Sequence, residues 1–140
     1  MKIYFAGSIR GGREDVELYM KLIALLEFYG SVLTEHVGHG NVSAQGERGL
    51  SDVEIYERDM AWLRESDVVV AEVTTPSLGV GYELGKAEDM IKPLLCLFRA
   101  GTQRSLSAMV AGNKRITVVS YVDLAGAADE IKKFFGQLKK

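Results

Sequence analysis

The feature that most constrains the fold is a series of short apolar runs that show no polar alternation. The clearest is Val68-Val69-Val70-Ala71, and similar runs occupy 2–6 and 92–98. Strands are continuously apolar in this way when helices cover both faces of a parallel sheet. Segments with helical spacing separate the runs. The pattern predicts an α/β domain with a doubly wound five-stranded parallel sheet, a Rossmann-like or flavodoxin-like three-layer sandwich.

The element boundaries follow from local signals. Ser51 and Glu54 form a capping-box pattern at the start of the second helix, and Gly30 is expected to end the first. The segment 36–50 contains four glycines and no periodicity, so it is predicted to be a long, functional loop. Predicted strands cover 2–6, 31–35, 67–72, 92–98 and 115–121; predicted helices cover 13–29, 51–65, 79–91 and 124–138, with a short helix within 105–111.

The size and composition favour one soluble domain spanning residues 1–140. The net charge of −2 gives no basic surface for a nucleic-acid polymer. No apolar run reaches the roughly 18 to 20 residues that span a bilayer, and the N-terminus does not resemble a signal peptide. The single cysteine, Cys96, lies in an apolar run and is expected to be a buried, unreactive thiol. A cytoplasmic location is therefore expected.

Ligands of such sheets bind beyond the carboxyl ends of the strands, so the loops there are the candidate site. The first of these loops runs from Gly7 to Arg13. Its glycines would let the backbone approach an anion at the following helix start. It lacks the Gly-Lys-Ser/Thr ending of a phosphate-binding Walker loop and the spacing of a dinucleotide fingerprint. A ligand loop and a plain strand-to-helix turn are both open interpretations.

The second candidate loop, at 74–85, leads into the third helix. Ser77 and the N–H groups near Gly79 could seat a phosphate. Glu83 falls in the first turns of this helix, where the positive end of the helix dipole would keep it ionised, as a nucleophile requires. The alternative is a surface glutamate that only complements the helix terminus.

Three further side chains are candidates on weaker grounds. Asp59 lies beside the apolar face of its helix, where a raised pKa would suit an acid, although a solvent-facing carboxylate is the simpler interpretation. Tyr4 lies in a buried strand and could equally be a core residue. His36 ends the second strand and could contact a base. No ligand spacing accompanies His36 and His39, so no metal is expected.

Five segments together resemble the 2'-deoxynucleoside 5'-phosphate N-hydrolases, within the nucleoside 2-deoxyribosyltransferase superfamily. They include GSIRGGRED at 7–15 and PSLGVGYELG at 76–85. The resemblance extends from residue 2 to about residue 122, and its motifs are long and in register. The resembling segments are 5–15, 32–37, 67–74, 76–85 and 106–109.

The resemblance implies a role for each candidate. Glu83 would be the nucleophile that forms a glycosyl-enzyme ester, Asp59 the acid that helps the base depart, and Tyr4 a neighbour of the reacting sugar. No cofactor is implied. A homodimer is implied, in which Ser107, Ala108 and Met109 of one subunit complete the site of the other. The implied substrate-binding residues of the subunit itself are Phe5, Ala6, Gly7, Ser8, Ile9, Arg10, Tyr19, His36, Ser77 and Gly79.

Two other functions remain open. A nucleoside 2-deoxyribosyltransferase would pass the sugar to a second base rather than to water, and Ser77 with the segment 106–108 favours a phosphorylated substrate instead. A non-catalytic nucleotide-binding domain would keep the glycine loops without needing Glu83 and Asp59 together. The segment 38–50 matches the family poorly, which leaves the base preference open, and the choice between deoxyribose and ribose is also open.

Overall fold

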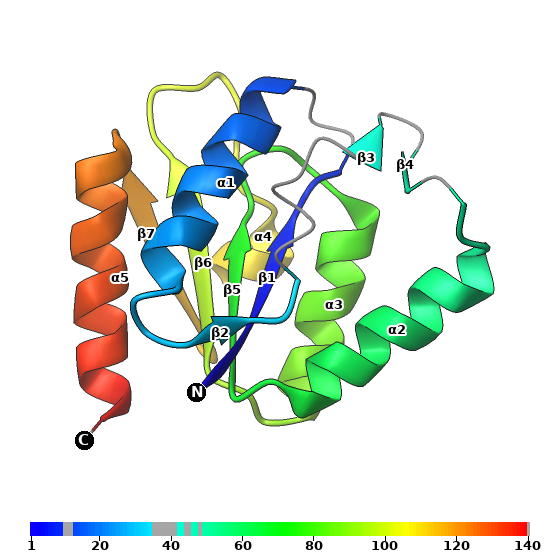
Figure 1. Ribbon diagram of the computed structural model, residues 1–140. Helices are drawn as coiled ribbons and strands as arrows, with labels where there is room; N and C mark the ends of the chain where they lie inside the picture. Colours follow the sequence, from blue (N-terminus) through cyan, green and yellow to red (C-terminus); the bar gives the residue numbers. More distant parts are fainter. Residues whose placement is uncertain (10–12, 35–41, 44–45, 48, 140) are drawn as a thin grey trace.

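The computed structural model describes residues 1–9, 13–34, 42–43, 46–47 and 49–139. Its centre is a five-stranded sheet in which every neighbouring pair is parallel (Figure 1). The order β2-β1-β5-β6-β7 is 2-1-3-4-5 when the five strands are counted along the chain, which is the flavodoxin-like order. The predicted α/β fold is confirmed. The strands are β1 (Lys2–Gly7), β2 (Ser31–Val32), β5 (Val68–Glu72), β6 (Leu94–Arg99) and β7 (Ile116–Tyr121).

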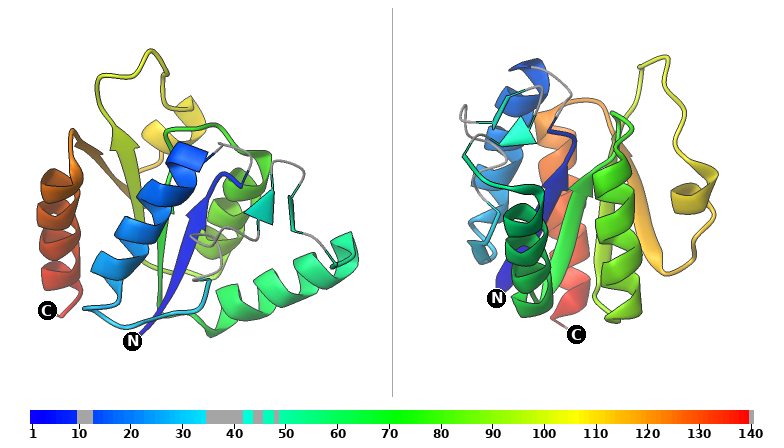
Figure 2. Two further views of the ribbon diagram at one scale, coloured as in Figure 1. Left: turned by 45° about the horizontal axis from the view of Figure 1, so that its top comes forward. Right: turned by 90° about the vertical axis from the view of Figure 1, so that its right-hand side faces the viewer.

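Helices cover both faces of this sheet, as Figures 1 and 2 show. Because side chains alternate across a strand, Val68 and Val70 pack toward α1 and α5, whereas Val69 and Ala71 pack toward α2 and α3. Both faces are buried, which explains the missing polar alternation. No helix among the described residues is long and apolar enough to cross a membrane. The helices are α1 (Arg13–Leu26), α2 (Asp52–Glu65), α3 (Leu78–Asp89), α4 (Ala108–Ala111) and α5 (Leu124–Leu138).

Gly30 does not end the first helix, so that prediction was wrong. Helix α1 stops at Leu26, and Gly30 is not in the left-handed conformation of a C-terminal glycine. A Cβ atom at Gly30 would lie 2.2 Å from the carbonyl oxygen of Met1. The neighbouring Ser31 N–H donates to that same oxygen at 2.9 Å. Gly30 therefore allows the chain to pass close to the start of β1.

The segment between β2 and α2 is not only a loop. Two short antiparallel strands, β3 (Val42–Ser43) and β4 (Gly46–Glu47), pair within it. The second strand of the main sheet is also shorter than predicted, since β2 ends at Val32. The capping box at the start of α2 is confirmed: Ser51 Oγ accepts from Glu54 N–H at 3.1 Å, and Glu54 Oε2 accepts from Ser51 N–H at 2.7 Å.

Helix α3 ends in a turn that places a β-branched residue in the left-handed region. Ile91 has a φ of 57°, and the N–H groups of Ile91 and Lys92 bond back to Glu88 and Ala87 at 2.9 and 3.0 Å. Glycine is preferred at this position because it has no Cβ to clash. Ile91→Gly should raise the free energy of unfolding by roughly 0.5–1 kcal/mol in urea denaturation.

The control for this prediction is Val122→Gly, because Val122 and Ile91 are both 79% exposed and only Ile91 has a positive φ. At Val122 the substitution only adds backbone freedom, so it should destabilise. Equal losses of stability in the two variants would contradict the assignment of strain to Ile91.

Candidate active site

A pocket between α2 and α3 brings two carboxylates together. It has a volume of about 380 Å³ and receives Asp59 from α2 and Glu83 from α3. We call it the carboxylate pocket. Asp59 is thus not directed to bulk solvent; its side chain is 16% exposed. The residues that line the pocket are Asp52, Ile55, Tyr56, Asp59, Met60, Leu78, Gly79, Tyr82 and Glu83.

Tyr4 reaches Glu83 from the sheet. It is 1% exposed and packs with the residues of β1 and β5 that face α2 and α3. Its hydroxyl donates a hydrogen bond to the Glu83 carboxylate. Burial, followed by the negative charges of Glu83 and Asp59, raises the pKa of Tyr4 far above its usual range. The phenol therefore stays protonated and remains a hydrogen-bond donor.

Glu83 is a weaker acid than the sequence suggested. Burial, and next the negative charge of Asp59, raise the pKa of Glu83 to about 8, while the hydrogen bond from Tyr4 acts in the opposite direction. The prediction that the helix dipole keeps Glu83 ionised is wrong. Helix α3 begins at Leu78, so Glu83 lies beyond the first turn, where the dipole has most of its effect. At neutral pH Glu83 is mostly protonated.

Arg58 is a charged neighbour of this pair that the sequence did not single out. Its Nε and Nη2 atoms donate to Asp59 Oδ1 at 3.0 and 2.9 Å. The guanidinium also lies over the ring of Trp62, 4.8 Å from the centroid. Arginine and tryptophan four residues apart share one face of α2, so the stacking fixes the guanidinium beside Asp59.

Two tyrosines flank the opening of the carboxylate pocket. The rings of Tyr56 on α2 and Tyr82 on α3 lie 6.3 Å apart, and their hydroxyl oxygens are separated by 3.5 Å. Both line the pocket and both remain exposed. Sequence reasoning missed them because an isolated tyrosine on a helix has no distinguishing pattern; only the pairing of α2 with α3 brings them together.

Ser77 and Gly79 lie where the phosphate seat was predicted, at the start of α3. Ser77 is the N-cap, and its Oγ accepts from Val80 N–H at 3.3 Å. The hydroxyl proton can still be donated, because a serine hydroxyl is both donor and acceptor. Gly79 lines the carboxylate pocket and Ser77 lines a neighbouring groove. The start of α3 thus separates two hollows.

The neighbouring hollow is a large groove, about 950 Å³, between α3 and α4. We call it the apolar groove. Ser107 and Met109 line it, whereas neither lines the carboxylate pocket. Ser107 Oγ caps α4 by accepting from Met109 N–H at 3.3 Å, and Ala108 beside it is exposed. On its rim Leu78 is 93% and Met109 83% exposed, which is unusual for large apolar side chains.

Most of the substrate-binding residues predicted on β1, just after it and on α1 belong to the core. Phe5, Ala6 and Tyr19 are buried, and the rings of Phe5 and Tyr19 meet edge to face at 5.6 Å. A Cβ at Gly7 would lie 2.8 Å from the Tyr19 ring, so Gly7 is needed for this packing. Ser8 is buried and Ile9 partly so; Arg10 and His36 lie outside the described residues.

Two other sequence predictions concern metals and the thiol. Within the described residues, no three His, Cys, Asp or Glu side chains are grouped to hold a metal ion, and His36 and His39 are not among those residues. Cys96 is fully buried in β6, as predicted, and burial raises the pKa of its thiol to about 12. The thiol is therefore unreactive at neutral pH.

Comparison with known proteins identifies the family. The model of the family described as nucleoside 2-deoxyribosyltransferase matches residues 3–125. The chain belongs to this family. The match extends from β1 through β7 and includes Asp59 and Glu83.

Individual relatives agree with this membership. The chain is 58% identical to the 5-hydroxymethyl-dUMP N-hydrolase of Esox lucius over 114 residues, which cover 80% of this chain and 79% of that protein. It is 59% identical to the enzyme of the same name from Tetraodon nigroviridis over 113 residues, 80% of each chain. The solution structure of BlsM superposes with a TM-score of 0.76 over 99% of this chain and 94% of that one, at 24% identity, and supports the fold.

Proposed function

We propose that this protein hydrolyses the N-glycosidic bond of (2'-deoxy)nucleoside 5'-monophosphates, releasing the free base and (deoxy)ribose 5-phosphate. The observation that carries the proposal is the carboxylate pocket. In it, Glu83 accepts a hydrogen bond from Tyr4, and the negative charge of Asp59 raises the pKa of Glu83. Glycoside hydrolysis uses a pair of carboxyl groups beside the bond that is cleaved. Close relatives that are named N-hydrolases of a deoxynucleoside monophosphate support the same reaction.

The reaction would proceed in two steps. A Glu83 carboxylate oxygen attacks the anomeric carbon, the carbon–nitrogen bond breaks, and its electron pair leaves with the base, which takes up a proton from Asp59. The resulting glycosyl ester on Glu83 is then hydrolysed by water, whose proton returns to Asp59. Splitting the displacement in this way gives two lower barriers. The Tyr4 hydroxyl orients Glu83 and releases it toward the sugar as the ester forms.

The two carboxyl groups need to hold one proton between them. In the free pocket this proton resides on Glu83, whose pKa is about 8. Attack requires the opposite arrangement, with Glu83 ionised and Asp59 protonated. We infer that substrate binding moves the proton from Glu83 to Asp59, which creates the nucleophile and the acid together. Because the two groups interact, their titration belongs to the pair.

The proposed phosphate seat lies between the two hollows. Ser77 and the N–H groups at the start of α3 would bind the 5'-phosphate, since an anion is favoured at a helix N-terminus. A second copy of the chain, seated on the apolar groove, would bring its Ser107 to the same phosphate. The exposed Leu78 and Met109 support such an interface, because a second subunit would remove both from water.

Ser107→Ala tests the shared site. The variant should raise the KM for a deoxynucleoside monophosphate by about tenfold, since one hydrogen bond to a charged group is lost, while kcat changes little. Steady-state kinetics gives both constants. Ser105→Ala, in the same loop, is the control. If KM is unaltered in the Ser107 variant, the partner subunit does not supply a phosphate ligand through this residue.

Base release from a panel of nucleotides tests the function itself. Deoxynucleoside and ribonucleoside 5'-monophosphates, with 5-hydroxymethyl-dUMP among them, would be incubated beside the matching free nucleosides, and the bases separated by chromatography. We expect release from monophosphates without an acceptor base. Release from nucleosides only, and only with a second base present, would instead identify a 2-deoxyribosyltransferase. No release from any compound would leave a nucleotide-binding domain as the function.

A further inference from the structure

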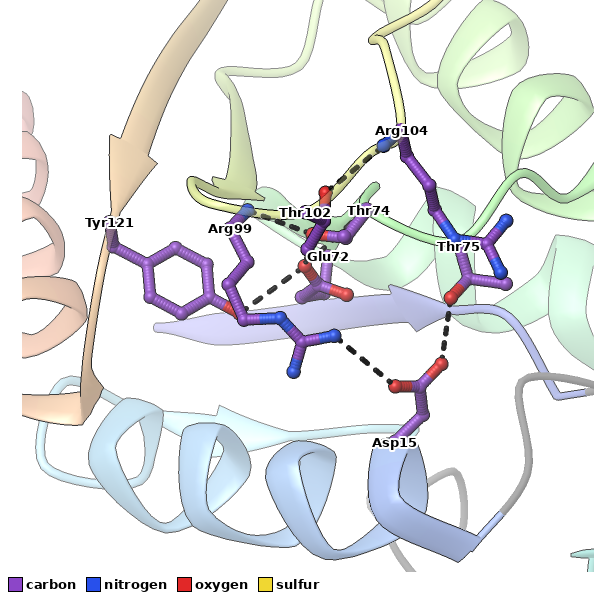
Figure 3. Close-up of polar contacts among 8 residues, drawn as sticks. All are labelled: Asp15, Glu72, Thr74, Thr75, Arg99, Thr102, Arg104 and Tyr121. Atoms are coloured by element: carbon purple, nitrogen blue, oxygen red, sulfur yellow. Dashed lines mark hydrogen bonds and ion pairs between the residues drawn. The ribbon is translucent and has the colours of Figure 1, made fainter.

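A ring of polar contacts lies at the carboxyl ends of the strands and includes the loop 73–77, which joins β5 to α3 (Figure 3). Within the loop, Thr75 Oγ1 donates to Asp15 Oδ2 on α1 at 2.8 Å. The other oxygen of Asp15 pairs with Arg99 Nη2, at the end of β6, at 3.7 Å. The Arg99 N–H donates to Thr74 Oγ1 at 2.8 Å, which closes the ring back onto the loop.

The direction of each hydrogen bond in the ring is fixed. Because the Arg99 N–H can only donate, Thr74 Oγ1 accepts from it and directs its own proton to Glu72 Oε1. The Tyr121 hydroxyl donates to the same oxygen at 3.3 Å, as does the Thr74 N–H at 3.3 Å. With Glu72 ionised, reversing any one of these hydroxyls would leave two donors or two acceptors facing each other, so the contacts then have a single arrangement.

Such a ring contributes little to the stability of the fold. Glu72 is 1% exposed, its Oε2 atom has no partner within the described residues, and burial raises the pKa of the carboxyl. Asp15 is also buried. Polar groups buried in this way contribute little net stability, and apolar residues of similar size often serve better. What the ring does supply is a single geometry for the segment it surrounds.

We propose that Asp15, Glu72, Thr74 and Thr75 are positioning residues that hold the loop 73–77 for binding of the substrate's 5'-phosphate. This inference rests on the proposed function, because it gives Ser77 the role of phosphate ligand. Thr75 lies two residues before Ser77, so the link from Thr75 to Asp15 sets where the start of α3 stands relative to α1. No residue of the ring lines the carboxylate pocket, so the ring acts on binding and not on the chemical step.

Thr75→Val tests this role, because valine keeps the shape of threonine and loses its hydroxyl. The KM for a deoxynucleoside monophosphate and the Kd for 2-deoxyribose 5-phosphate should each rise about tenfold, while kcat stays within about twofold. Thr75→Ser restores the hydroxyl and should return both constants to the wild-type range. Thr117→Val is the matched control: it makes the same change at an exposed site on β7, outside the ring.

The outcomes separate the inference from the function on which it rests. Loss of phosphate affinity in Thr75→Val with recovery in Thr75→Ser supports the positioning role. A lower melting temperature in Thr75→Val with unchanged KM and Kd overturns it, since the ring would then serve the fold alone. If the wild-type protein neither hydrolyses the monophosphates nor binds 2-deoxyribose 5-phosphate, the proposed function fails and this inference fails with it.

Discussion

Glu83→Gln is expected to remove turnover and to make the protein more stable. Glutamine is close to isosteric with glutamic acid but cannot attack the anomeric carbon, so kcat should fall by a factor of about 10³ or more. Substrate binding should remain within a few-fold, because the amide still accepts the hydrogen bond from Tyr4. Single-turnover base release and equilibrium titration measure the two effects separately.

The stability effect has a defined pH dependence. The folded-state pKa of Glu83 is about 8, above the ordinary value of 4.5, so between these pH values the native state binds a proton that the unfolded chain releases. Wild-type stability should therefore fall as pH rises through this window. Glu83→Gln lacks this titration, so it should gain about 2 kcal/mol over wild type at pH 9 and little at pH 4.

Glu57→Gln is the control for both effects, since Glu57 lies exposed on α2. It should alter neither turnover nor the pH dependence of stability. A Glu83→Gln variant that keeps near-normal turnover would exclude Glu83 as nucleophile. If Glu83→Gln has no turnover but its stability depends on pH as that of wild type does, Glu83 is ionised in the free protein.

Asp59→Asn should slow the reaction and also reverse its pH dependence. In the proposed mechanism the carboxyl pair must hold one proton, so kcat/KM should fall as pH rises through about 8, where Glu83 loses that proton. The variant has no acid to supply, and its rate should be about 10² lower. It also lacks the negative charge that raises the pKa of Glu83. Its remaining activity depends on ionised Glu83 alone and should increase with pH, with a midpoint below that of wild type.

The pH profile of kcat/KM for the two proteins is the measurement. Asp52→Asn, which changes another carboxylate lining the pocket, is the matched control and should keep the falling limb near pH 8. An Asp59→Asn protein with the wild-type rate and profile would exclude Asp59 as the proton donor. A reduced rate with an unreversed profile would leave Asp59 important but not as the proton donor.

The candidate site was only partly predictable. Their positions made Glu83, Asp59 and Tyr4 candidates and the resemblance gave them roles; the structure brings all three together between α2, α3 and β1. Tyr19 was expected at the pocket wall, yet its ring is buried against Gly7. A sequence pattern identifies a buried face but not what that face packs against. The Thr75–Asp15 contact had no sequence signal at all, because it joins residues 60 positions apart.

What the sequence by itself determined is the order and type of the main elements. Short apolar runs without polar alternation, separated by helical segments, indicate strands covered on both faces. Ser51 and Glu54 mark the start of a helix, because a capping box forms between residues three positions apart. The tertiary structure decided the chemistry. The pKa of Glu83 depends on burial and on the charge of Asp59 from another helix. The geometry of the loop 73–77 depends on groups from α1, β6 and β7. Acidity and position are set by the space around a group, which only the folded chain defines.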